Sequence, residues 1–360
     1  MSAGTLPFVR VSGDPFEVGY QHGQARRAAL REFIDDDLTR INKLAAAPTT
    51  LAELSPVLAE YSAAIAAATP ALSEEIAGLA QGADLAAAEA VLLQTRRELI
   101  GFQKIPARGD CTTYASLSAG PDGTPVLAQT VDLNGNLDDQ IAVLDIELSG
   151  PGHRRALVLS FGGLLGYLGI NSDGLAIGLN LVLGGTWRPG LPPYLAIRHL
   201  LDTATSVDHA LDILPTLPLA SSRSLTVCDQ GSLACVEILD NQIRLTTEPD
   251  AVESTHTNHF LHPDFIAADE LNVFARNSSL QRLKACRAGL AGFAESRTAV
   301  GVEEHFALLA QPGVCVADTK DIRRERTVAA VVMLPARGEL HVRPGDPAQA
   351  STVTHGIAQP

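Results

Sequence analysis

The pattern of apolar positions divides the chain near residue 111. Before this point, apolar residues recur every three or four positions, which predicts helices over 14–46, 51–68, 73–80 and 85–103. After it, short apolar runs predict strands over 112–118, 125–132, 140–148, 154–160, 174–181, 222–229, 233–239, 242–247, 328–334 and 339–343. Helical spacing returns at 193–203, 206–214, 274–291 and 301–310. Helix-forming sequence therefore gives way to strand-forming sequence at Cys111.

The order of these elements is not a strict alternation of strand and helix. Runs of strands followed by pairs of helices predict two mostly antiparallel sheets packed face to face, with helices on the outside. We therefore expect an α+β fold, a four-layer αββα sandwich preceded by a helical segment over 1–110. No internal repeat or proline-rich linker marks a second domain, so we expect one structural domain.

Cys111 stands at the junction between the two halves. Pro106 and Gly109 break the helical pattern before it, and the turn sequence at 120–123 joins the two strands predicted after it. If the Asp110–Cys111 bond were cut, Cys111 would carry a free α-amine, which titrates at about 7.7–8.0, beside a nucleophilic thiol. One residue would then supply both nucleophile and base. The alternative is a buried cysteine that acts only as a small apolar group.

Asp132 ends the second predicted strand. If 112–118 and 125–132 form a hairpin, the Asp132 carboxylate lies near the start of the first strand and can accept a hydrogen bond from the Cys111 amine. The alternative is an ordinary turn residue, which is how we interpret Asp138 and Asp139.

A second polar cluster lies at 254–262 (STHTNHFLH). The Asn258 amide is a candidate donor to the oxyanion that forms during amide cleavage, and loss of one such donor costs about 2.7–4 kcal/mol of barrier. His256, His259 and His262 are spaced by three, which leaves a metal site as an alternative. Threonine and asparagine disfavour the helix that a shared face requires, and no HExxH pattern accompanies the cluster. We therefore expect no metal. A further interpretation is that all three histidines are ordinary loop residues held by hydrogen bonds.

Composition narrows the class of protein. The 360 residues are 46% hydrophobic, with a mean hydropathy of +0.12, and can form a large core. The net charge of −14 and the lack of a basic block disfavour a nucleic-acid partner, because phosphate neutralisation needs clustered positive charge, and we expect none. No signal-peptide pattern or long apolar run is present, so we expect no membrane partner. Five cysteines without a framework spacing are typical of reduced thiols, and we expect a cytoplasmic protein with Cys228 and Cys235 in its core.

Taken together, these residues resemble the peptidase C45 family, the isopenicillin N acyltransferase-like enzymes, which are N-terminal nucleophile (Ntn) hydrolases. The resemblance spans nearly the whole chain. It is carried by VSGDPFEVGYQHG at 11–23, CTT at 111–113, QTVD at 129–132, HTNH at 256–259 and TVAAVVM at 327–333. The first and fourth of these stretches are specific, whereas CTT alone carries no information.

The resemblance implies an inactive precursor that cuts itself between Asp110 and Cys111. The α segment, 1–110, would stay associated with the β segment, 111–360. Matching by position makes Cys111 the nucleophile and base, Asp132 the residue that orients its amine, and Asn258 the oxyanion donor. Asn180 resembles a second pocket-lining position. An arginine is expected near the nucleophile, and either Arg282 or Arg326 fits. The family often has glycine where this chain has Asp110, which bears on the rate of self-cleavage.

The implied reaction forms a thioester on Cys111 and requires no cofactor. Resolution by water makes an amidohydrolase, and resolution by an amine acceptor makes an acyltransferase. The acidic charge disfavours a nucleotide-bearing donor such as an acyl-CoA, so we expect a small N-acyl amide substrate. Trp187 lies in a Gly/Pro-rich loop that either rims the acyl pocket or is an ordinary surface loop. Two rival functions remain: a ligand-binding protein without chemistry, and an intact-chain thiol hydrolase using His256 or His259 as base.

Overall fold

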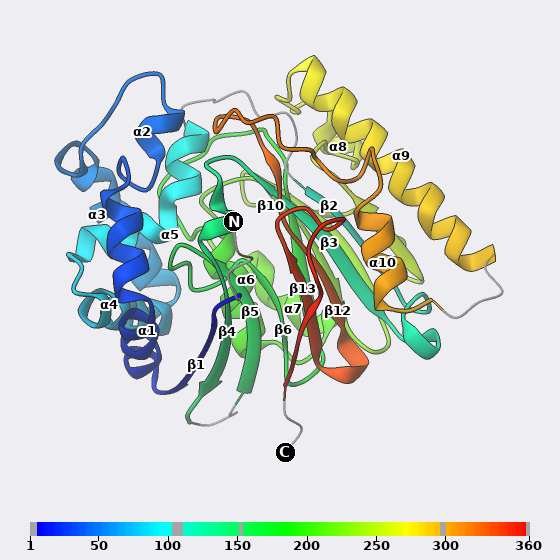
Figure 1. Ribbon diagram of the computed structural model, residues 1–360, viewed down its shortest axis with the longest axis horizontal. Coiled ribbons are helices and arrows are strands. Elements are labelled where there is room, and N and C mark those ends of the chain that lie inside the picture. Colours follow the sequence, from blue (N-terminus) through cyan, green and yellow to red (C-terminus); the bar gives the residue numbers. More distant parts are fainter. Residues whose placement is uncertain (1–5, 103–110, 151–153, 296–299, 358–360) are drawn as a thin grey trace.

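Two sheets form the centre of the molecule (Figure 1). The computed structural model describes residues 6–102, 111–150, 154–295 and 300–357. The eight-stranded sheet has the order β1 (Phe8–Gly13), β4 (Ile141–Leu148), β5 (Arg154–Phe161), β6 (Leu168–Asn171), β7 (Ala176–Leu181), β8 (Arg223–Cys228), β9 (Leu233–Leu239) and β10 (Gln242–Leu245). The six-stranded sheet has the order β11 (Glu253–His256), β2 (Cys111–Ser116), β3 (Val126–Leu133), β12 (Arg326–Leu334), β13 (Glu339–Pro344) and β14 (Val353–Gly356).

The sheets are antiparallel except at one edge, and they pack face to face. Among the described strands only β1 and β4 pair in parallel. Strands β2 and β3 of the smaller sheet contact β7 and β8 of the larger one. All four strands are buried along their whole length, so their polar residues as well as their apolar ones lie inside the molecule.

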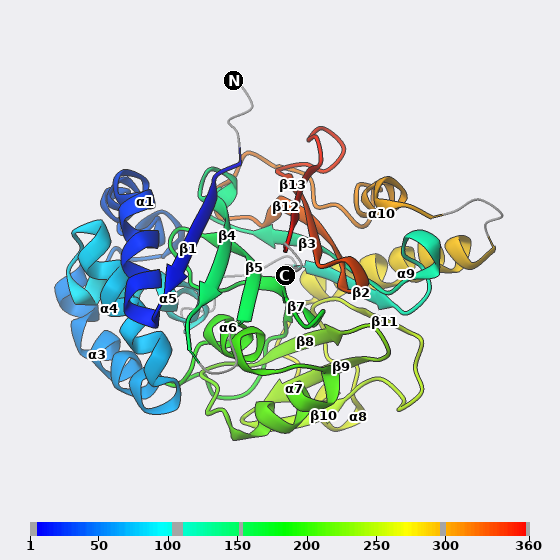
Figure 2. The same ribbon diagram turned by 90° about the horizontal axis from the view of Figure 1, so that it is seen from below.

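Helices cover both outer faces of the sheet pair. The larger sheet carries α6 (Pro193–Thr203) and α7 (Val207–Ile213), which contact β5 to β8, as Figure 2 shows. The smaller sheet carries α9 (Val273–Glu295) and α10 (Val302–Leu309), which contact β2, β3 and β12. A short α8 (Pro263–Ile266) precedes α9. The predicted four-layer αββα sandwich is confirmed.

The N-terminal helices form a separate group beside the sandwich, drawn in blue and cyan in Figure 1. They are α1 (Pro15–Asp35), α2 (Ile41–Leu44), α3 (Leu51–Ala68), α4 (Pro70–Ala83) and α5 (Ala87–Phe102). Glycines let α1 and α4 approach each other closely: a Cβ atom on Gly19 would lie 1.9 Å from the Glu75 carbonyl oxygen, and one on Gly78 would lie 2.1 Å from that of Phe16. No side chain larger than hydrogen fits at either position.

Two buried ion pairs join this helical group to the sandwich. In α4, Glu75 accepts two hydrogen bonds from Arg198 of α6, at 2.8 and 2.9 Å. In α5, Glu98 accepts one from Arg223 of β8, at 3.1 Å. All four side chains are at most 1% exposed. Removing one partner from such a pair leaves an uncompensated buried charge, so the pairs fix where the helical group docks.

One predicted helix, 14–46, is wrong in its extent. The helix α1 ends at Asp35, and residues 37–40 all have positive φ before the single turn of α2. Three consecutive acidic residues, 35–37, stand at the negative end of the α1 dipole, where they disfavour continuation. The other seven predicted helices have counterparts in the structure, and α4 is longer than the predicted 73–80 because Pro70 is accommodated at its first position.

All ten predicted strands are present, and four short ones, β1, β6, β11 and β14, escaped prediction. Among the described residues, no single helix is long and apolar enough to span a membrane, although α4 and the adjoining part of α5, bent by 119°, reach that length and apolarity as a pair.

Candidate active site

Cys111 is the first residue of β2, in the centre of the sandwich. Its side chain is 1% exposed. The hairpin with β3 sets Cys111 opposite Val131, next to Asp132 along that strand. Asp110 and the predicted cleavage point lie outside the described residues.

Three side chains distant in sequence hold the Cys111 backbone. Its N–H donates to Asn258 Oδ1 at 3.0 Å. Its carbonyl oxygen accepts from Arg282 Nη1 at 2.7 Å and from Asn180 Nδ2 at 3.0 Å. Arg282 Nη2 also donates to Asn258 Oδ1, at 2.7 Å. The two buried asparagines and the arginine therefore fix both polar groups of this residue.

The orientation of the Asn258 amide is set by its partners. Two donors, the Cys111 N–H and the Arg282 guanidinium, face its oxygen, so this atom must be Oδ1 rather than Nδ2. Its Nδ2 donates to the Leu181 carbonyl at 2.9 Å. In this geometry the Asn258 oxygen accepts from the Cys111 nitrogen, and one of the two N–H groups of its amide donates to Leu181. The Asn180 Oδ1 atom is buried without a partner among the described residues.

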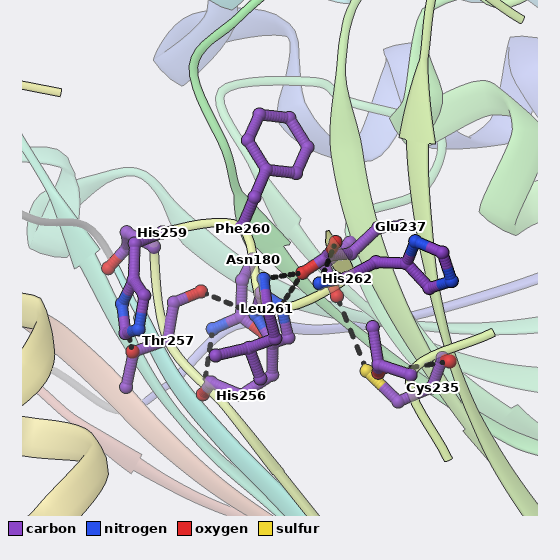
Figure 3. Close-up of polar contacts among 12 residues, drawn as sticks. Asn180, Cys235, Glu237, His256, Thr257, His259, Phe260, Leu261 and His262 are labelled. Carbon is purple, nitrogen blue, oxygen red and sulfur yellow. Dashed lines mark hydrogen bonds and ion pairs between the residues drawn. The ribbon is translucent and has the colours of Figure 1, made fainter. Parts of the chain in front are cut away.

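Glu237 anchors the loop that carries Asn258 (Figure 3). Its carboxylate accepts from His256 Nε2 at 2.8 Å and from the N–H groups of Leu261 and His262 at 2.6 and 3.0 Å. Burial alone would raise the pKa of Glu237, but these hydrogen bonds outweigh it and the pKa is lowered. The sequence signal for this residue was a single carboxylate inside the apolar strand LACVEIL, which our sequence reasoning passed over.

Asp132 lies in a threonine network. Its Oδ1 accepts from Thr327 at 2.7 Å and its Oδ2 from Thr130 at 3.3 Å, and Thr130 Oγ1 accepts from the Thr112 N–H at 3.1 Å. The carboxylate is thus fully buried beside the start of β2, linked to the residue that follows Cys111.

Tyr167 was not predicted and lies against the thiol. Its hydroxyl is 3.7 Å from Cys111 Sγ, and its ring stacks on Tyr194 with a centroid distance of 5.1 Å. No sequence motif predicted this contact, because it joins β2 to the loop before β6 across the interface between the sheets.

The remaining candidates lie apart from Cys111. Arg326, at the start of β12, forms ion pairs with Asp138 and Asp318. Trp187 is half-buried; its indole donates to Ser222 Oγ at 3.1 Å and its ring lies over the Arg223 guanidinium. Of the two candidate arginines, the structure therefore brings Arg282 to the cysteine.

Each histidine of the polar cluster has a partner other than the thiol. His256 bonds Glu237 and the Thr257 carbonyl, His259 Nδ1 lies 2.7 Å from Ser279 Oγ, and His262 caps α8. Burial lowers the pKa of His259 to about 4. Within the described residues, no group of His, Cys, Asp and Glu is arranged to hold a metal ion.

The arrangement suits a thiol nucleophile. A buried guanidinium binds the backbone carbonyl of the cysteine, and the thiol itself is buried. The cysteine nitrogen faces a side-chain oxygen, and a carboxylate lies one residue along the paired strand. Two sheets between helical layers, with this cysteine opening an inner strand, define the class of N-terminal nucleophile hydrolases.

Comparison with known proteins identifies the family. Residues 118–349 match the model of the acyl-coenzyme A:6-aminopenicillanic acid acyl-transferase family, to which this chain belongs. The 40 kDa form of acyl-coenzyme A:6-aminopenicillanic-acid-acyltransferase from Emericella nidulans is 28% identical over 306 residues, which cover 84% of this chain and 80% of that protein. The chain is accordingly an enzyme of the class that acts on amide bonds.

Two solved structures match this chain over part of its length. Penicillin V acylase from Agrobacterium tumefaciens has 15% sequence identity and a TM-score of 0.48, with 69% of this chain and 86% of that one covered. The N-acylethanolamine-hydrolyzing acid amidase orthologue of Caenorhabditis elegans has 14% identity and a TM-score of 0.45, with 69% and 100% covered.

Proposed function

We propose that this protein is a self-processing N-terminal cysteine amidohydrolase that cleaves a small N-acyl amide through a thioester on Cys111. The observation that carries the proposal is the environment of Cys111: its nitrogen and carbonyl are held by Asn258, Asn180 and Arg282 at hydrogen-bond distances. Most buried backbone groups are paired by other backbone groups, whereas here three buried side chains from separate parts of the chain converge on one cysteine.

Processing begins with attack of the Cys111 thiol on the carbonyl carbon of Asp110. The C–N bond to Cys111 breaks, its nitrogen takes the thiol proton, and a thioester remains. Water then attacks the thioester, releasing the Asp110 carboxyl group and the Cys111 thiol. The product has a free α-amine on Cys111, at the nitrogen that faces Asn258 Oδ1.

Turnover uses the same atoms. The α-amine takes the thiol proton, the sulfur attacks the acyl carbonyl of the substrate, and the protonated amine returns its proton to the leaving amine. Water resolves the acyl-enzyme in a hydrolase. We propose that Asp132 and Asn258 orient the amine, and that Asn180 and Arg282 hold the Cys111 carbonyl so that the thiol keeps its direction.

Acyl transfer is a second candidate, because the relative from Emericella nidulans is named for it. A substrate screen with N-acyl amides, run with water alone and with added amine acceptors, separates the two reactions. The net charge of −14 leads us to propose hydrolysis first.

Intact mass under denaturing conditions tests the proposal. The wild type should give two fragments that meet at Asp110/Cys111, whereas Cys111→Ala should give one full-length mass. Cys228→Ala is the matched control: it removes a buried thiol that contacts the Asp229 carbonyl at 3.6 Å and should be processed like the wild type. Cleavage that persists in Cys111→Ala would refute self-processing. A single uncleaved mass in the wild type would favour an intact-thiol hydrolase or a binding protein.

A further inference from the structure

The loop before β6 is held in place by buried side chains as well as by backbone hydrogen bonds. The Gly163 carbonyl accepts from Gln94 Nε2 at 2.9 Å, and the Leu165 N–H donates to Gln94 Oε1 at 3.0 Å. The Leu165 carbonyl accepts from Arg198 Nη1 at 3.1 Å. Gln94 is fully buried in α5 and uses both ends of its amide on this loop. Moving this loop would leave these buried polar groups without partners, which costs free energy.

Packing restricts the same loop from the other side. A Cβ on Gly162 would lie 2.5 Å from the Phe33 ring, and one on Gly163 would lie 2.8 Å from Leu30 and 2.9 Å from Leu93. Both glycines have positive φ, 54° and 82°. The helices α1 and α5 therefore form the surface on which this turn is built.

The loop ends at Tyr167, whose hydroxyl faces the thiol. The distance to Cys111 Sγ is 3.7 Å, within the range of a hydrogen bond to sulfur, and both side chains are at most 3% exposed. Phe161 and Tyr194 hold the ring from two sides, at centroid distances of 5.1 Å each. A buried thiolate needs donors in place of water, and a phenol O–H is one.

We propose that Tyr167 is a catalytic residue whose hydroxyl donates a hydrogen bond to the Cys111 sulfur, and that Gln94 in the N-terminal helical segment positions it. The inference rests on the proposed function in taking Cys111 as the nucleophile. The inference adds a hydrogen-bond donor to the reacting Cys111 sulfur. It also makes Gln94 of α5 part of the active site, although the reaction proposed above uses no side chain of α5.

The test is the pH dependence of Cys111 alkylation by iodoacetamide, followed by peptide mass spectrometry so that the other four cysteines do not interfere. Tyr167→Phe removes only the hydroxyl. Because the hydroxyl favours the thiolate, its loss should move the alkylation profile to higher pH by about one unit. Tyr194→Phe is the matched control: its hydroxyl meets Arg223 Nη2 at 3.4 Å instead of the sulfur, and its profile should match the wild type.

Gln94→Leu tests the positioning role. Alone, it should move the profile in the same direction as Tyr167→Phe. Combined with Tyr167→Phe, Gln94→Leu should shift the alkylation profile no further, because it acts through the tyrosine. A purely structural defect would instead add its own shift to that of Tyr167→Phe. Gln94→Glu should recover the wild-type rate of Cys111 alkylation below neutral pH, since a protonated carboxyl group can make both hydrogen bonds.

An unchanged profile in Tyr167→Phe, or an equal movement in Tyr194→Phe, would overturn the assignment of Tyr167. Additive movements in the double variant would overturn the role of Gln94. These readouts need no substrate and no cleavage, so they fail independently of the proposed function, which fails if the wild type is neither processed nor active on amides.

Discussion

Mild acid should destabilise this fold through a histidine buried between α10 and the smaller sheet. His305 Nε2 lies 2.9 Å from the Ala119 carbonyl and must donate to it, so Nδ1, 2.8 Å from the Tyr114 hydroxyl, accepts. The ring is fully buried and neutral in this arrangement. Burial lowers the pKa of His305 from 6.5 to about 4, against a smaller opposing effect of the Ala119 hydrogen bond.

The sign and size of the effect follow from proton linkage. Between pH 6.5 and about 4 the unfolded chain binds a proton at this ring and the folded chain does not, so stability is complete above pH 6.5 and is lost as the pH falls. The gap of about 2.5 between the two pKa values, at about 1.4 kcal/mol per pH unit, gives a loss of about 3 kcal/mol at pH 4.

Urea unfolding followed by far-UV circular dichroism, at intervals from pH 7.5 to 4, measures this loss. The background is Cys111→Ala, so that the chain stays in one piece. His305→Gln keeps a donor and an acceptor but does not titrate, and its free energy of unfolding should fall by about 3 kcal/mol less over this range than that of the parent. The exposed His209→Gln is the control. Parallel pH profiles for the parent and His305→Gln would refute the reasoning.

Three further predictions concern the site and the helical group. Arg282→Met removes hydrogen bonds to Cys111 and Asn258 and should lower the rate of amide cleavage by at least tenfold, whereas Arg326→Met, which loses only ion pairs with Asp138 and Asp318, should stay within about threefold in the same assay. Asp132→Asn should keep the circular dichroism spectrum but lose most turnover, and wild-type turnover would contradict its role in orienting the amine. Gly78→Ala drives a methyl group into the Phe16 carbonyl and should lower the free energy of unfolding, measured by urea denaturation, by about 1–3 kcal/mol. Gly292→Ala, which has open space around it in α9, should raise the same free energy by up to about 1 kcal/mol.

The architecture was predictable because its signals are local. Most strands are short segments bounded by turn residues, and the turn at 120–123 fixes the hairpin that sets Cys111 opposite Val131. The missed strand β11 has the polar sequence ESTH and owes its conformation to pairing with β2, which no local pattern reveals.

The sequence named three residues that the structure brings to Cys111, Asn180, Asn258 and Arg282, but not how they bind it. Asn258 was predicted as an oxyanion donor, and that role stays a prediction. The sequence did not show that its oxygen faces the Cys111 nitrogen and that Arg282 reaches the same atom from α9. The choice between Arg282 and Arg326 depends on how α9 docks on the smaller sheet, which is a tertiary property. Tyr167 meets Cys111 across the interface between the sheets, and a contact of that kind leaves no spacing to read.

The larger sheet draws strands from both sides of Cys111: β1 precedes it by about a hundred residues and pairs with β4, which follows it. A cut before Cys111 would therefore change the order of the folding reaction without changing the fold. The intact chain folds in a first-order process. After a cut, the two unfolded segments must first associate, so the rate of refolding depends on their concentration. Formation of the nucleophile would thus make unfolding hard to reverse at cellular dilution, and the precursor would be the only form that folds readily.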